Sequence, residues 1–460
     1  MNSELSHLRG STFGPILVGG FAGTACMATA WFFTHLPWLG LEEQLAVPLI
    51  LAFWFLTLAA FASRVRRAKS IIVGLGAGAV SGIAGLVFFG SRLGKVATVQ
   101  GAAPALVPNA ILLVAGFMGL SIALGLLAGL VGRVIARDTT QNQPAAHWLG
   151  RFAIITAISI APLIFIGGLV TSTNSGMAVP DWPRTYGANM FLYPLAGHVG
   201  VVDSKPYPQV YVEHAHRLFG AFVGLSAFVL LTFTMLVERR SWAKWMAFAA
   251  FGAVCVQGVL GGARVIENST VKAMAHGILA QLTFGVVVAL AVVLSDRYRS
   301  LTPNQKLLEP ALARRIKFLC TLTLHSLLLQ LFLGAWYRHF HSKHVLYTHI
   351  AFSILVLIAA TIAGFTLSSE KARQNIVGPV TARLGLALAI VACLQFLLGW
   401  VAFGVAGLHP DPTSIAQAIT RTAHQANGGI LIALAAACYI WGRRLGRAGS
   451  AAPNTSPATA

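Results

Sequence analysis

Four histidines could bind a metal, because each comes early in a long apolar stretch: His216, His276, His349 and His424. An imidazole in hydrocarbon is costly unless it has a partner, so histidines inside membrane segments usually mark function. Two histidines that face each other across a helix bundle can bind one metal porphyrin through its two axial positions. Zinc would need three or four ligands. Pairs of histidines therefore favour heme, although a hydrogen bond to a neighbouring helix is the alternative for any one of them.

The composition indicates what must position these side chains. The chain has 460 residues, of which 56% are hydrophobic and only 10% are charged, whereas soluble domains carry about 25% charged residues. Its apolar residues come in blocks of about 20, the length that spans a bilayer. We therefore predict an all-α polytopic membrane protein with about twelve transmembrane helices, near residues 13–34, 45–62, 71–90, 109–136, 151–171, 209–236, 243–263, 271–295, 313–337, 345–367, 382–405 and 417–441.

The net charge of +20 does not indicate a nucleic-acid partner, because the basic residues form short clusters between apolar blocks. Loops rich in Lys and Arg alternate with loops that are poor in them, and the richer side of a membrane protein is cytoplasmic. The pattern predicts a multi-pass protein of the inner (plasma) membrane with both termini in the cytoplasm. All five cysteines fall inside apolar blocks, where packing is the expected role.

A short internal repeat divides the last eight predicted helices into two halves. Gln257-Gly-Val-Leu-Gly261 recurs as Gln330-Leu-Phe-Leu-Gly334 and as Gln395-Phe-Leu-Leu-Gly399, each time near the end of a helix. The fourth such helix ends in Ile166-Gly167-Gly168 without the glutamine. Glycines at such places allow helices to approach closely.

The repeat predicts two pseudo-symmetric four-helix heme bundles and an N-terminal extension. The expected domains are an unassigned four-helix membrane extension at 1–140, a first bundle at 150–296, a second bundle at 312–445 and a disordered tail at 446–460. His216 and His276 lie on the second and fourth helices of the first bundle, and His349 and His424 lie on the matching helices of the second.

Four motifs together resemble the heme A synthase family of bacteria and mitochondria, over about residues 150–445. They are Gly168-Leu-Val-Thr-Ser-Thr-Asn-Ser-Gly176, Asp181-Trp182-Pro183, Glu213-x-x-His216-Arg217 and His424-Gln425-Ala-Asn-Gly428. The resemblance implies oxidation of the C8 methyl of heme o to a formyl group, which makes heme A for cytochrome oxidase. Two features depart from the family pattern: the outer loops have no cysteine pair, and the first four helices lie outside it.

The resemblance also implies roles for individual residues. His216 and His276 would be axial ligands of the substrate heme o, whereas His349 and His424 would hold a resident heme b. Glu213 matches a family carboxylate beside the substrate and could relay protons or orient the substrate. The implied partners are the lipid bilayer, heme o delivered by heme o synthase, and an electron acceptor of unknown identity, with homo-oligomerisation left open.

Other side chains carry open alternatives. Arg217 could pair with a heme propionate or extend to lipid headgroups. The aromatic-rich 172–208 loop could be a lid over the first heme or an interfacial belt. We expect His214 to be exposed or structural and His325 to be a packed, hydrogen-bonded side chain. His339, His341 and His344 could contact propionates or bind a metal, but a solvated outer loop is the favoured interpretation.

Two other classes of protein use similar features. A diheme b-type cytochrome that takes electrons from quinol would use the same four histidines without altering a heme. A transporter could also have duplicated bundles, but it would bind no heme.

Overall fold

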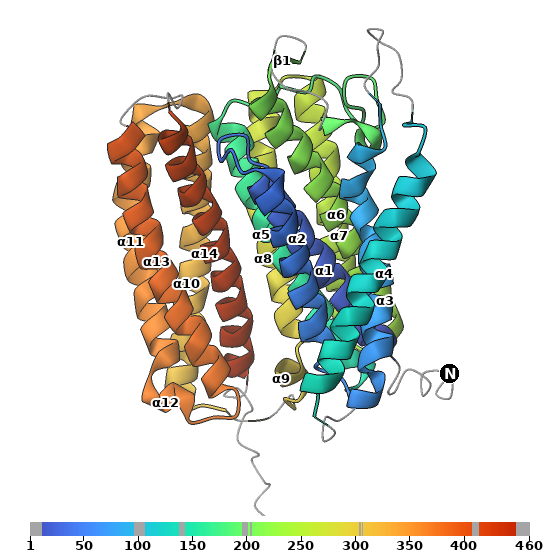
Figure 1. Ribbon diagram of the computed structural model, residues 1–460. Helices are drawn as coiled ribbons and strands as arrows, with labels where there is room; N and C mark the ends of the chain where they lie inside the picture. Colours follow the sequence, from blue (N-terminus) through green and yellow to red (C-terminus); the bar gives the residue numbers. More distant parts are fainter. Residues whose placement is uncertain are drawn as a thin grey trace, which may run out of the picture. The chain divides into compact units, whose positions relative to one another are not determined.

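The computed structural model describes residues 12–95, 106–137, 143–195, 201–202, 205–302, 305, 307–406 and 414–447 (Figure 1). Within them, twelve helices are long and apolar enough to cross a membrane. They are α1 (Phe13–Thr34), α2 (Glu43–Ala62), α3 (Ser70–Phe89), α4 (Ala110–Ile135), α5 (Ala145–Ser172), α6 (Tyr207–Val237), α7 (Ser241–Ile266), α8 (Thr270–Val293), α10 (Pro310–Phe340), α11 (Lys343–Ser368), α13 (Gly378–Ala406) and α14 (Ile415–Arg447). The prediction of a twelve-helix membrane protein is confirmed, with each helix within a few residues of its expected range.

Shorter elements connect these helices. They are the helices α9 (Asp296–Arg299) and α12 (Glu370–Arg373), the 3-10 turns η2 (Arg67–Lys69), η3 (Gly90–Arg92) and η4 (Met190–Leu192), and the strands β1 (Val201–Val202) and β2 (Lys205–Pro206). The predicted tail falls outside the described residues from 448 onward. The chain divides into two compact units, Met1–Ala273 and Met274–Ala460.

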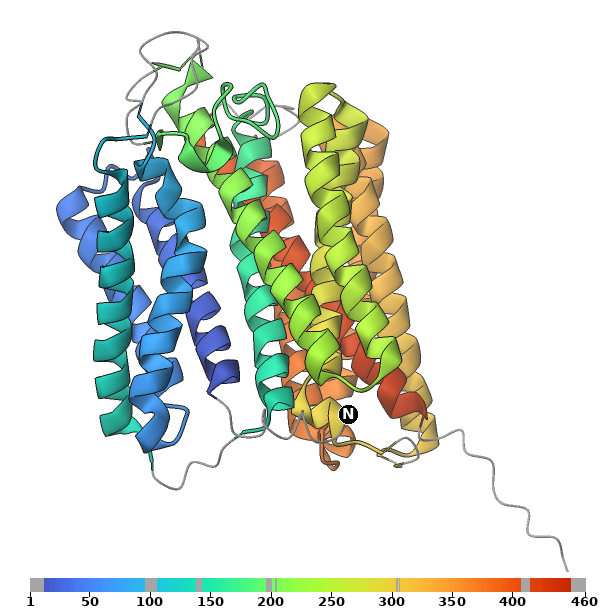
Figure 2. The ribbon, with the colours of Figure 1, turned by 90° about the vertical axis from the view of Figure 1, so that its right-hand side faces the viewer.

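In the first unit, helices α1 to α4 form one bundle, seen in Figure 2 as three blue helices (α1 to α3) and the neighbouring teal helix α4. Glycines let α3 and α4 touch, because a Cβ on Gly78 would lie only 3.0 Å from the Cα of Gly125. Ser121 Oγ on α4 donates a hydrogen bond to the Gly78 carbonyl at 2.5 Å. Trp54 Nε1 on α2 donates to Ser81 Oγ on α3 at 2.7 Å. The predicted N-terminal four-helix extension is thus a packed element.

The extension also packs on the helices that follow it. The Phe32 and Tyr211 rings stack with centroids 5.8 Å apart, and the Tyr211 hydroxyl donates to the Phe32 carbonyl at 3.0 Å. Phe88 on α3 meets Phe219 on α6 edge to face at 5.0 Å. Aromatic contacts of this kind stabilise packing beyond the area they bury. The extension therefore fixes the position of α6, which carries Glu213, His216 and Arg217.

A second contact links the extension to the loop after α5. The backbone of Gly90 lies against the Phe191 carbonyl, and the backbone of Gly94 lies against the Leu192 carbonyl. No Cβ fits at either glycine without displacing the opposite backbone.

We expect Gly94→Val to loosen this loop, because an added side chain would overlap the Leu192 carbonyl. Overpacking of this kind lowers the free energy of unfolding by about 1–3 kcal/mol. Thermal unfolding of the full-length chain in detergent measures the change. Gly116→Val on α4 is the matched control, because a Cβ there meets no atom within 4 Å. Equal stability of the two variants would show that the contact has no effect.

In the second unit, α10, α11, α13 and α14 form a four-helix bundle in which each helix contacts two others (Figure 1). Its buried apolar cluster includes Leu327, Val356, Leu388 and Leu431. These residues lie about one to two helical turns from the Gln330, His349, Gln395 and His424 positions on the same helices. The packed core therefore fills one end of the bundle, and the histidines lie beyond it. Helix α8 lies beside α14, where a Cβ on Gly285 would be 3.5 Å from Ile432.

Candidate functional site

His349 and His424 face each other within the second bundle. They come from the first half of α11 and of α14, and their ring centroids are 6.3 Å apart with the ring planes at 83°. A metal–imidazole bond is about 2 Å long, so two imidazoles on opposite sides of one metal ion have ring centres roughly 6 Å apart. The observed separation matches that requirement, and both histidines are only partly buried.

The glycine of the repeat makes room for each imidazole. A Cβ on Gly334 would lie 2.9 Å from His349 Cε1, and a Cβ on Gly399 would lie 3.1 Å from His424 Cε1. In the first unit, Gly167 stands in the same relation to His216, also at 3.1 Å. The glycine therefore admits the imidazole of the next membrane helix in three places, which gives the sequence repeat a structural reason.

The glutamine of the repeat also contacts the histidine. Gln330 Nε2 donates to the His349 carbonyl at 2.9 Å and lies 3.4 Å from His349 Nε2. Gln395 Nε2 lies 3.2 Å from His424 Nδ1. The orientation of Gln395 follows from its neighbours. Asn427 Nδ2 donates to the Val391 carbonyl at 3.2 Å, so it is the nitrogen that also donates to Gln395 Oε1 at 2.9 Å. The Gln395 N–H groups therefore face the imidazole.

The residues present fit a porphyrin held by two imidazoles. His349 Nδ1 is buried and has no hydrogen-bond partner among the described residues, and such an atom destabilises a protein by about 1–3 kcal/mol unless a ligand satisfies the ring. No cluster of three or more His, Cys, Asp or Glu suited to a metal occurs in the described part of the chain. Two nitrogens without a third ligand suit an iron whose other four positions belong to a macrocycle.

We expect Gly334→Ala to disturb this site, because the new methyl group would push on the His349 ring. The absorbance of bound heme should fall or shift in the purified protein. Gly404→Ala on α13 is the control, since a Cβ there meets nothing within 4 Å. Identical heme spectra for the two variants would contradict the proposed role of this glycine.

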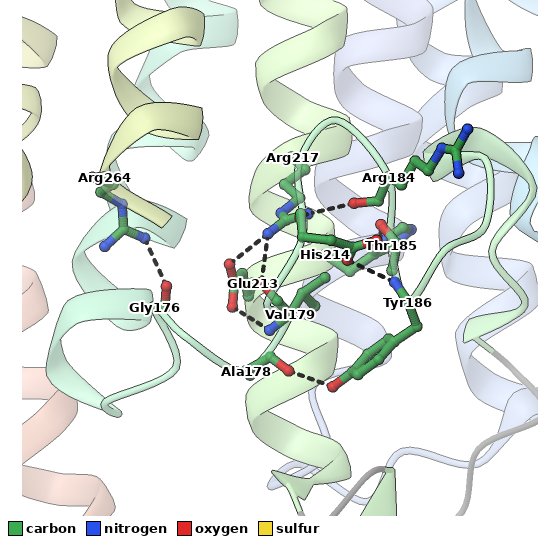
Figure 3. A network of polar contacts seen from close by, with 11 residues as sticks. Gly176, Ala178, Val179, Arg184, Thr185, Tyr186, Glu213, His214, Arg217 and Arg264 are labelled. Atoms are coloured by element: carbon green, nitrogen blue, oxygen red, sulfur yellow. Dashed lines mark hydrogen bonds and ion pairs between the residues drawn. The ribbon is translucent and has the colours of Figure 1, made fainter. Parts of the chain in front are cut away.

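In the first unit, Glu213 and Arg217 form a buried ion pair on α6 (Figure 3). Arg217 Nη2 lies 2.9 Å from Glu213 Oε1, and the two side chains are 8% and 2% exposed. The Val179 N–H donates to Glu213 Oε2 at 2.8 Å. Arg217 donates three more hydrogen bonds, to the carbonyls of Val179, Asp181 and Arg184. The pair thus ties the loop after α5 to the start of α6.

The described part of that loop, residues 173–195, folds on itself. Asp181 accepts hydrogen bonds from the backbone N–H groups of Tyr186 and Gly187 at 2.8 and 2.7 Å. The Tyr186 hydroxyl donates to the Ala178 carbonyl. Tyr186 and Gly187 both have positive φ, at 50° and 76°, a conformation that suits glycine and requires support at tyrosine.

His214 joins the same loop to α6. It is fully buried, with Nδ1 3.3 Å from Thr185 Oγ1 and its ring 5.2 Å from the Tyr193 ring. Its expected structural role fits this position. The loop packs over the start of α6, as a lid would; residues 196–200, 203 and 204 of the expected lid lie outside the described residues.

The other predicted site residues fall as follows. His276 is the seventh residue of α8 and belongs to the second unit, whereas His216 belongs to the first, so their pairing stays a prediction. His325 Nδ1 lies 2.8 Å from the Thr321 carbonyl, as expected for a hydrogen-bonded side chain, but the residue is exposed and the expectation that it is packed was wrong. The expected outer histidine loop is short: His339 lies in the last turn of α10, His341 ends that helix with a left-handed φ of 55°, and His344 begins α11. All five cysteines are free thiols.

Sequence reasoning missed the contacts of Gln330, Gln395 and Asn427, because it used the glutamines only as a mark of duplication. It also missed Arg264, in the last turn of α7, whose Nη2 donates to the Gly176 carbonyl at 3.2 Å. Arg264 directly follows the predicted membrane helix 243–263, and a charged residue at such a place is the signal that could have found it.

The fold and this site define a class: a multi-pass helical membrane protein in which one histidine pair, His349 and His424, has a geometry suited to porphyrin binding. Comparison with known proteins agrees. Residues 150–346 match the family model COX15-CtaA, described as cytochrome oxidase assembly protein. These residues are similar to the heme A synthase family, the family that the motifs resemble.

Individual relatives are distant. The chain is 26% identical to the heme A synthase of Beijerinckia indica over 223 residues, which are 42% of this chain and 58% of that protein. It is 30% identical to the Chelativorans heme A synthase over 156 residues, 32% of this chain and 41% of the relative. It is 24% identical to human heme A synthase COX15 over 160 residues, 30% of this chain and 38% of the relative. The chain thus spans about half the length of the curated relatives it matches. No solved structure matches it.

Proposed function

We propose that this protein converts heme o to heme A by oxidising the C8 methyl group to a formyl group, in the plasma membrane with both termini in the cytoplasm. The observation that carries the proposal is the opposed His349–His424 pair, whose 6.3 Å ring separation suits one iron. The family match at 150–346 supports the reaction, and it includes His216 and His276 but ends before His349.

In this proposal the two halves of the chain bind different hemes. His349 and His424 hold a resident heme b, which supplies electron transfer when bound. His216 and His276 are axial ligands of the substrate heme o; their pairing rests on the sequence repeat and on the family. Conversion of a methyl group to a formyl group removes two pairs of electrons and adds one oxygen atom. If the oxygen comes from water, a separate electron acceptor takes the four electrons; if it comes from dioxygen, dioxygen is itself the oxidant.

The residues around Glu213 position the substrate end. Each oxygen of Glu213 accepts one hydrogen bond, as an ionised carboxylate does. Together with Arg217 it holds the loop after α5 against α6, one helical turn from His216. This arrangement keeps the Glu213 carboxylate beside the substrate and limits the access of water. Glu213 can therefore accept a proton during the oxidation.

Extraction and mass analysis of the bound pigment test the proposal. We expect the full-length protein, expressed with a source of heme o, to yield heme b together with heme A or a hydroxylated form of heme o. Expression without heme o should yield heme b alone. A diheme b-type cytochrome would yield only heme b under both conditions, and that result would refute the synthase.

The variant His276→Ala separates the two halves. We expect it to accumulate heme o while it retains heme b. Loss of heme b with continued oxidation of heme o would reverse the assignment of substrate and resident sites.

A further inference from the structure

Two arginines lie near the buried Glu213 carboxylate, and only one of them forms an ion pair with it. Arg217 forms the ion pair with Glu213 at 2.9 Å. The two Nη atoms of Arg217 make four hydrogen bonds, one to Glu213 and three to backbone carbonyls, so their four N–H groups are all used. Arg217 therefore has only its Nε–H left for a ligand.

Arg264 is the second arginine. It projects from the last turn of α7 toward the loop after α5 (Figure 3). Its Nη2 donates to the Gly176 carbonyl at 3.2 Å, and Glu213 and Arg217 are both close enough to interact with its charge. No carboxylate forms an ion pair with Arg264 among the described residues. The Gly176 carbonyl occupies one of its five N–H groups.

The backbone around Arg264 is shaped to keep the guanidinium in place. A Cβ on Gly176 would lie 2.8 Å from Arg264 Nη1, so a larger residue there would displace the guanidinium from this position. Two residues earlier on α7, Gly262 packs directly against the Trp182 indole of the same loop. The guanidinium is thus held between α7 and the loop.

The charges in this cluster do not balance. Glu213 carries one negative charge, whereas Arg217 and Arg264 carry two positive charges, so one positive charge remains beside the membrane segment. A cation at such a place calls for an anionic partner. The planar fork of arginine matches a carboxylate with two parallel hydrogen bonds.

We propose that Arg264 binds a carboxylate of the substrate, which for a porphyrin is a propionate, at the loop end of the His216 site. This inference rests on the proposed function and adds a residue that orients the substrate. A lipid phosphate has similar chemistry, so the test must distinguish the two sources of the anion.

The test uses the full-length protein in nanodiscs of zwitterionic lipid, titrated with heme o and with its propionate dimethyl ester while Soret absorbance is followed. We expect the wild type to bind the ester about tenfold more weakly, because charge-assisted hydrogen bonds are lost. Arg264→Leu should bind both forms equally, and as weakly as the wild type binds the ester. Arg264→Lys should recover part of the preference, since it restores the charge without the fork.

Arg239→Leu is the control, because that side chain is exposed at the opposite end of α6. An unchanged heme b spectrum in Arg264→Leu verifies that the variant folds. If this variant still prefers heme o over the ester, the inference is wrong while the proposed function stands. If its only effect appears when anionic lipid is added, Arg264 binds lipid and the inference is likewise wrong. If the wild type binds neither form, the proposed function and the inference both fail.

Discussion

His349→Ala is expected to lose most of its bound heme b. His349 and His424 are the two imidazoles that face each other at 6.3 Å, so removal of one ring leaves the iron with a single protein ligand on one side. The geometry also predicts rescue. His349→Gly, grown and purified with free imidazole, should regain low-spin heme b absorbance, because the small molecule can occupy the space of the missing ring. Pyridine hemochrome assay and visible spectra of the purified variants measure both effects.

His325→Ala is the matched control for this experiment. His325 is exposed on α10, and its Nδ1 lies 2.8 Å from the Thr321 carbonyl on the same helix. The His325→Ala variant should therefore bind as much heme as the wild type. Full heme b occupancy in His349→Ala, with an unchanged spectrum, would contradict the assignment of this ligand.

Arg217→Met should be the most destabilising single change in the first unit. It leaves the Glu213 carboxylate buried without its cation and deprives three backbone carbonyls of a donor. Breaking a buried ion pair from one side lowers the free energy of unfolding by about 3–5 kcal/mol. The loop after α5 should become accessible to protease. Thermal unfolding and limited proteolysis in detergent check both expectations.

The chain offers a control pair of the same chemistry. Arg240 and Glu238 are 2.8 Å apart, but the Arg240 side chain is 26% exposed. The Glu238 side chain is itself only 5% exposed, but it keeps hydrogen bonds from the backbone N–H groups of Arg239 and Arg240 when the Arg240 side chain is removed. Arg240→Met should therefore have a smaller effect than Arg217→Met. The double variant Glu213→Gln with Arg217→Met should be more stable than Arg217→Met alone, because it removes the uncompensated charge. Equal effects of Arg217→Met and Arg240→Met would refute the importance of the buried pair.

The membrane helices could be predicted from sequence because span length and apolarity decide them. The ends were harder to place. We expected one helix to end near residue 337, where Arg338 and His339 interrupt the apolar pattern. In the structure α10 continues to Phe340 and ends at His341, because backbone hydrogen bonds persist past the apolar segment into polar surroundings. Charge therefore marks the membrane boundary, and it does not mark the end of the helix.

The histidines could be predicted because their position in the repeat is visible in the sequence. The contacts around the histidines could not be predicted from the sequence. The role of Gln395 depends on Asn427 and on the Val391 carbonyl, which fix the orientation of its amide group. The place of Arg264 depends on the path of the loop at Gly176. Local patterns contain no information about such long-range contacts, and the pairing of His216 with His276 stays a prediction for the same reason.

The electron paramagnetic resonance spectrum of the oxidised, purified full-length protein, expressed without a source of heme o so that it carries heme b alone, tests the central claim most directly. Two axial imidazoles on one ferric iron give a low-spin signal, and ring planes close to perpendicular, here 83°, make it strongly anisotropic. We expect such a signal, and we expect its loss in His424→Ala. A high-spin signal from the wild type, or a low-spin signal that survives in His424→Ala, would show that His349 and His424 do not hold a heme between them.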